Sequence, residues 1–137
     1  MTIPKQPTAD DDGLLTASEI AQLKLNADWV VLSACNTIAG DKPGAEALSG
    51  LARAFFYAGA RALLVSHWYV DSDAAVKLVT RAFAEIATNP TIGRAEALRR
   101  AMLAFMSTTD RPKNWTPAAH PAVWAPFVVV GEGGAIQ

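Results

Sequence analysis

The chain has 137 residues, 51% of them hydrophobic, and a formal net charge of −1. This size suits one domain with a buried core, the interspersed charges argue against a nucleic-acid partner, and no apolar run approaches the roughly 20 residues of a membrane span. The only cysteine, Cys35, excludes an intramolecular disulfide and a multi-cysteine zinc site, and it suits a reducing, cytoplasmic compartment.

The first third of the chain leads from a polar arm into an apolar strand. Residues 1–13 are typical of a mobile arm, with two prolines and few apolar residues. Thr16 and Glu19 have the spacing of a capping box and predict a short helix that ends near Leu23. The valine-rich run that begins at Trp29 predicts a strand buried on both faces. Cys35 stands at its carboxyl end, where open parallel sheets place their ligands and their chemistry.

The next segment predicts a crossover between two parallel strands. A helix is expected over about 45–57, with Gly59 as its stop. Its apolar stripe has helical spacing and consists of Leu48, Leu51, Ala52, Phe55 and Phe56. Residues 62–65 form a second short apolar run. Strand, helix and strand in this order favour an α/β fold with parallel neighbours.

Two helices and a last strand are expected after residue 66. Asp71 and Ser72 can cap a helix that ends before Pro90, and its inward stripe is Ala75, Leu78, Val79, Ala82 and Ile86. Thr91 predicts the start of the next helix, and the residues expected to face inward are Ala95, Leu98, Met102, Phe105 and Met106. Residues 107–121 read as a loop, and residues 127–130 read as a strand that Pro126 confines to a beginning or an edge.

Parallel neighbouring strands would bring Cys35 and residues 66–71 to the same end of the sheet. The groove there would combine a thiol with the side chains of Ser66, His67, Trp68 and Asp71. This set suggests a cysteine nucleophile beside an acidic pocket for a basic side chain. The alternatives are structural: Cys35 can be a buried apolar residue, Asp71 a helix cap and His67 a packed side chain.

Several stretches, in order, strongly resemble the CHAT domain, a relative of caspases and separase. They are residues 30–37 (VVLSACNT), 46–60 (EALSGLARAFFYAGA), 61–71 (RALLVSHWYVD), 94–99 (RAEALR) and 120–131 (HPAVWAPFVVVG). The resemblance implies a caspase-like three-layer α/β sandwich, with a mostly parallel sheet flanked by helices. It also implies a Cys–His peptidase dyad that cleaves protein or peptide substrates. Because the sequence has no metal-ligand spacing, phosphate loop or dinucleotide fingerprint, we expect no cofactor or metal. Cys35 matches the family's nucleophile, and Asp71 resembles an acidic residue of the substrate pocket.

One feature departs from the family pattern. The family's base is a histidine followed by glycine on the strand before the cysteine strand, and no histidine precedes Cys35 here. We therefore expect an incomplete, C-terminal portion of a CHAT domain over 14–131, with a tail over 132–137. Such a portion should be nearly inactive alone, because general-base help is worth roughly 10²–10⁴-fold in rate. His67 is the possible substitute base.

The missing histidine strand also bears on the partners that we expect for this chain. The strand that leads to Cys35 would have an exposed edge, through which a homodimer could form. The family is often joined to helical repeats, so a helical-repeat region of the intact protein is another expected partner. The alternative to a peptidase is a non-catalytic protein-interaction module that keeps the caspase-like fold.

Overall fold

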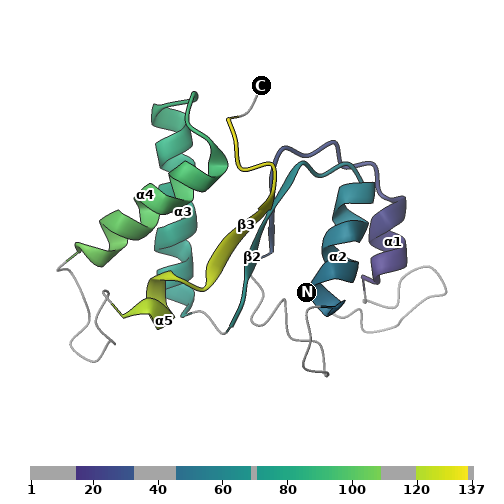
Figure 1. Cartoon of the computed structure of the whole chain (residues 1–137), viewed down its shortest axis with the longest axis horizontal. Helices are drawn as coiled ribbons and strands as arrows, with labels where there is room; N and C mark the ends of the chain where they lie inside the picture. The colour runs from purple at the N-terminus through teal and green to yellow at the C-terminus, as the bar shows by residue number, and fades with distance from the viewer. Residues whose placement is uncertain (1–14, 33–45, 69–70, 109–119, 136–137) are drawn as a thin grey trace, which may run out of the picture.

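The computed structural model describes residues 15–32, 46–68, 71–108 and 120–135, which form helices on both faces of a small sheet. The elements are α1 (Ala17–Gln22), β1 (Val30–Leu32), α2 (Glu46–Tyr57), β2 (Ala62–Ser66), α3 (Ser72–Thr88), α4 (Arg94–Met106), α5 (Pro121–Trp124) and β3 (Phe127–Gly131). Figure 1 shows α1 and α2 on one side of the sheet and α3, α4 and α5 on the other. This arrangement confirms the predicted α/β class.

The described strands form one mixed sheet in the order β1-β2-β3. β1 and β2 are parallel, with Leu32 opposite Val65, so α2 is the crossover helix that the sequence predicts. β3 is antiparallel to β2 because the chain enters it at the carboxyl end of β2, where the His67 amide donates to the Pro126 carbonyl at 2.8 Å. Among the described strands, the parallel arrangement expected for most of the sheet therefore holds for β1 and β2 and not for β3.

β2 is the centre of the domain, and all five of its residues are buried. Leu64 packs on the face of α3 and α4, whereas Leu63 and Val65 pack on the face of α1 and α2, as the two-residue period of a strand requires. β1 is only half-buried, because it lies at the edge of the described sheet. The prediction that this strand is buried on both faces is therefore wrong for Val30–Leu32.

Two helix ends follow the sequence signals closely. At α1, the Glu19 amide donates to Thr16 Oγ1 at 3.3 Å and the Thr16 amide donates to Glu19 Oε2 at 2.7 Å, which confirms the capping box. α2 ends at Tyr57 and is stopped by Gly59, whose φ of +94° is the left-handed conformation that glycine adopts readily. The amides of Gly59 and Ala60 donate to the carbonyls of Phe56 and Phe55, which closes the helix in a Schellman motif.

The start of α4 differs from the prediction. Thr91 bonds to the Asn89 side chain at 2.7 Å in a turn, and the helix begins at Arg94. Ala95, expected to face inward, is exposed, whereas Arg94 is only 1% exposed. Its Nη1 donates to the carbonyls of Glu132 at 3.0 Å and Gly134 at 3.4 Å, and its Nη2 lies 3.6 Å from Asp28 Oδ1. Arg94 therefore joins α4 to the segment after β3 and to the entrance of β1.

Candidate functional site

The candidate site lies at the carboxyl ends of β1 and β2. The parallel register places Leu32, the last described residue of β1, opposite Val65, one residue before Ser66. The predicted nucleophile Cys35 lies outside the described residues. The other predicted site residues, Ser66, His67, Trp68 and Asp71, are described, and all of them follow or end β2 at this edge of the sheet.

Ser66, His67 and Trp68 differ in exposure although they are consecutive. Ser66 is fully buried and pairs with Phe127 of β3, so it is still part of the interior of the sheet. His67 and Trp68 are exposed, and their ring centroids are 6.2 Å apart at a tilt of 38°. The chain therefore turns from a buried strand to two surface rings within two residues.

Trp68 is held in place by α5, a helix that the sequence pattern did not predict. The Trp68 indole Nε1 donates to the Ala122 carbonyl at 3.1 Å, while 39% of the residue remains exposed. His120 caps α5 because its Nδ1 accepts the Ala122 amide at 3.2 Å. Pro121 at the first helical position, preceded by a capping residue, was the signal for this single turn.

Asp71 is the N-cap of α3, as predicted. Its Oδ1 accepts the amides of Asp73 and Ala74, both at 3.0 Å, at the start of a 17-residue helix. A carboxylate has about four lone-pair sites on two oxygens, so the cap leaves acceptor capacity for a bound cation. Capping and substrate binding are therefore compatible at this residue.

The described residues contain neither a metal-ligand cluster nor a membrane span. No group of three or more His, Cys, Asp and Glu side chains in the described ranges is close enough to hold a metal ion. None of the described helices is both long and apolar enough to cross a bilayer.

Comparison with known proteins identifies the family. The CHAT domain model matches residues 3–132, nearly the whole chain, and the chain belongs to the CHAT domain family. It is 35% identical over 118 residues to Tetratricopeptide repeat protein 28 of Mus musculus and to the same-named protein of Homo sapiens. Each match covers 86% of this chain but only 4% of the relative's length. No solved structure matches the chain.

Proposed function

We propose that this domain carries the nucleophile of a CHAT-type cysteine endopeptidase, and that Cys35 is that nucleophile. The observation that supports the proposal is the parallel pairing of β1 and β2, because it brings both strand ends to one edge of the sheet. Cys35 follows Leu32 by three residues, so its Cα lies within about 11 Å of the Leu32 Cα at ~3.8 Å per residue. The proposed fold of the intact domain is the caspase-like sandwich.

The proposed reaction forms and then hydrolyses a thioester. The Cys35 thiolate attacks the scissile carbonyl, the peptide C–N bond breaks as the leaving amine takes up a proton, and water releases the acyl group. The thiol must first lose its proton, and at neutral pH an ordinary cysteine is mostly protonated. Both histidines of the sequence, His67 and His120, follow Cys35, so neither matches the family's base. His67 is the better substitute, because the Nδ1 of His120 already caps α5.

Substrate selection is assigned to the loop after β2. Asp71 is proposed to receive a basic side chain on the residue before the cut, and Ser66 and Trp68 are proposed to shape the pocket. Trp68 is suited to this role because its exposed ring is fixed by the bond to Ala122. A planar guanidinium can both stack on an indole and pair with a carboxylate.

Covalent labelling tests the proposal. A biotinylated peptidyl acyloxymethyl ketone with Arg at its reactive residue should label the full-length protein, and Cys35→Ala should abolish the labelling. Asp71→Asn is the matched variant for the pocket, because Asn retains the cap but removes the charge. It should reduce labelling by the Arg probe and leave labelling by a matched Leu probe unchanged. Arg-probe labelling that survives Cys35→Ala would refute the assignment of the nucleophile.

The alternative is a non-catalytic interaction module joined to a helical-repeat region. The observation that favours it is that both curated relatives are named as tetratricopeptide repeat proteins and are far longer than this chain. A module of this kind should bind its partner equally well after Cys35→Ala and should show no probe labelling in the full-length protein. Labelling that depends on Cys35 would decide in favour of the peptidase.

Two further proposals concern assembly and location. β1 lies at the edge of the described sheet, and pairing through this edge would give a homodimer. Multi-angle light scattering that finds a monomer at micromolar concentration would contradict it. The single cysteine supports a cytoplasmic location, which imaging of the tagged full-length protein would test.

A further inference from the structure

Two side chains at the carboxyl end of β2 are linked through the backbone of one residue of α5. The Ala122 carbonyl accepts a hydrogen bond from the Trp68 indole Nε1 at 3.1 Å. The amide of the same residue donates to His120 Nδ1 at 3.2 Å. We call His120, Ala122 and Trp68 the indole relay. A change in the bond at one end of the relay therefore acts on the other end through a single residue.

The His120 side chain supplies an acceptor that the backbone of α5 does not. The helix is one turn, Pro121–Trp124. The first backbone bond of this turn is donated by the Val123 amide to the His120 carbonyl at 3.0 Å. The Ala122 amide lies too early in the turn for such a bond, and its acceptor among the described residues is His120 Nδ1. Loss of this acceptor would leave the Ala122 amide without a partner in this part of the chain.

Packing keeps α5 on the domain whether or not the cap is present. Val123 and Trp124 are half-buried and pack against the core cluster on the face of α3 and α4. His120 and Ala122 are exposed, so the start of the turn is open to solvent protons while its end is fixed. We expect loss of the cap to reorient the residues at the start of the turn without unfolding the domain.

A histidine cap depends on the protonation state of its ring. Nδ1 can accept a hydrogen bond in the neutral imidazole, but both ring nitrogens are donors in the imidazolium. Rotation of the protonated ring therefore cannot restore an acceptor for the Ala122 amide. Histidine side chains change charge between about pH 5 and 8. The cap should be present above this range and should be lost as the pH falls through it.

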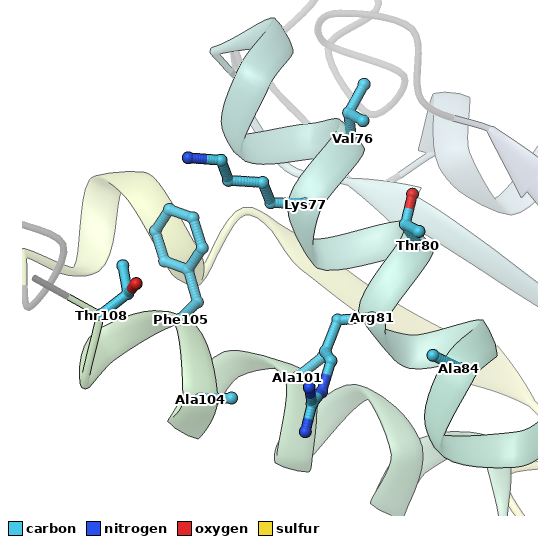
Figure 2. A pocket seen from close by; sticks show the side chains of 9 residues that line it. All are labelled: Val76, Lys77, Thr80, Arg81, Ala84, Ala101, Ala104, Phe105 and Thr108. Atoms are coloured by element: carbon cyan, nitrogen blue, oxygen red, sulfur yellow. The ribbon is translucent and has the colours of Figure 1, made fainter. Parts of the chain in front are cut away.

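The elements packed against α5 also carry charged groups. Figure 1 shows α5 beside the start of α3, where the charged side chains are Asp71, Asp73 and Lys77. Lys77 lines the groove between α3 and α4 with Phe105 (Figure 2), and no charged residue follows Arg100 in α4. Carboxylates as a class titrate near about pH 4 and lysines near about pH 10. Measurements between pH 5.5 and 8 lie between these two ranges.

We propose that His120 is a positioning residue of the substrate pocket: its neutral ring holds the Ala122 carbonyl as the acceptor of the Trp68 indole, and its protonation releases the indole. This role of His120 rests on the proposed role of Trp68 in that pocket. Loss of a helix cap typically shifts a local equilibrium by about fivefold. Selection of a basic side chain by the pocket should therefore weaken by about fivefold as the pH falls from 8 to 5.5.

Nuclear magnetic resonance of the indole N–H groups tests the relay without a catalytic assay. Trp68→Phe identifies the Trp68 signal among the four tryptophans of the 137-residue chain. Every sample carries His67→Gln, because the ring centroid of His67 lies 6.2 Å from that of Trp68 and its titration would also move the signal. As the pH falls from 8 to 5.5, the Trp68 indole proton should move toward its position in a free tryptophan peptide.

Two substitutions of His120 provide the matched comparison. Asn is a preferred cap and accepts at every pH, so in His120→Asn the Trp68 signal should keep its high-pH position throughout. Ala has no acceptor, so in His120→Ala the signal should keep the released position throughout. The relay is refuted if the signal moves with pH in His120→Asn, or if it is independent of pH while His120 is present. If His120→Ala does not fold, the comparison between His120 and His120→Asn still decides.

The ratio of labelling by the Arg and Leu acyloxymethyl ketone probes in the full-length protein tests the role in selection. Both probes react with the same thiol, so the effect of pH on the thiol cancels in the ratio. Between pH 8 and 5.5 the ratio should fall about fivefold more in the unchanged protein than in His120→Asn, because His67 titrates in both. An equal fall in both proteins would overturn the role of His120 in selection. Labelling by neither probe would refute the proposed peptidase, whereas the indole signals alone decide whether His120 positions Trp68.

Discussion

The buried guanidinium of Arg94 should be energetically coupled to Asp28, and a double-mutant cycle can measure this coupling. Arg94 is 1% exposed, and its Nε and Nη2 have no hydrogen-bond partner among the described residues. The only ion pair found for it in the described part of the chain is with Asp28, at 3.6 Å, and half of the Asp28 side chain is exposed. Loss of Asp28 would leave the buried Arg94 charge without its counter-charge, whereas loss of Arg94 would leave a carboxylate that water still reaches.

The magnitudes follow from these contacts. Arg94→Met keeps much of the apolar stem and loses the 3.0 Å bond to the Glu132 carbonyl, so it should cost about 2 kcal/mol, in the range for hydrogen bonds to charged groups. Asp28→Asn removes the counter-charge of a buried cation. That loss costs ~3–5 kcal/mol in fully buried pairs, and about 1–3 kcal/mol is expected here because Asp28 is half-exposed. In the double variant no buried charge remains, so its cost should fall short of the sum by about 1–2 kcal/mol.

Equilibrium unfolding in urea, followed by circular dichroism, gives the four free energies of the cycle. The denaturant slope should stay constant among the variants, which indicates that the compactness of the folded and unfolded states is unchanged. Additivity within about 0.5 kcal/mol is the behaviour of independent sites. Such a result would refute the view that Asp28 compensates the buried charge of Arg94.

Three other predictions test local contacts. Gly93→Ala should destabilise the fold by about 2–3 kcal/mol in urea unfolding, because the new Cβ would collide with the Gly133 carbonyl oxygen. Gly50→Ala is its control: apart from the backbone of its own helix, no described residue lies within 4 Å of the added Cβ, so this change in α2 should stabilise by about 0.5–1 kcal/mol. Equal effects would contradict the steric argument. Hydrogen bonds from Arg99 and Arg100 lower the pKa of Glu96 from 4.5 to about 2. The ionised carboxylate therefore stabilises the fold above pH 4.5, and this contribution is lost as the pH falls toward 2. Glu96→Gln should flatten the acid limb of a stability–pH curve, and an unchanged limb would refute the assignment. Asp71→Ala should cost about 1 kcal/mol as the loss of a helix cap, whereas Asp71→Asn should cost a few tenths at most. A large cost for Asp71→Asn in thermal melts would show that the charge, not the cap, matters for folding.

Sequence signals correctly predicted the helix ends that depend on neighbouring residues. The capping box of Thr16, the stop at Gly59 and the cap at Asp71 are confirmed because each depends on residues within four positions. The predicted start of α4 was wrong because the residues that determine it lie elsewhere in the sequence. Arg94 is buried by carbonyls 38 and 40 residues away, and an arginine gives no sign of burial in a hydrophobic pattern. A single-turn helix such as α5 is too short to show periodicity.

The candidate site also has features that local sequence signals predict and features that they do not. The sequence placed Asp71 at the start of a helix and Ser66 at the end of a strand, and the structure confirms both positions. The anchor of Trp68 could not be predicted, because its acceptor, the Ala122 carbonyl, is 54 residues away. The pairing of the two strands was inferred from the crossover pattern, and their register confirms it.

The antiparallel pairing of β3 with β2 helps to hold the loop after β2, to which substrate selection is assigned. Because β3 runs back along β2, the segment that precedes it reaches the carboxyl end of β2 and supplies two acceptors. The Pro126 carbonyl accepts the His67 amide at 2.8 Å, and the Ala122 carbonyl accepts the Trp68 indole at 3.1 Å. A fully parallel sheet would bring the opposite end of this strand to the site. The mixed topology thus allows residues 67 and 68 to be exposed without being free to move.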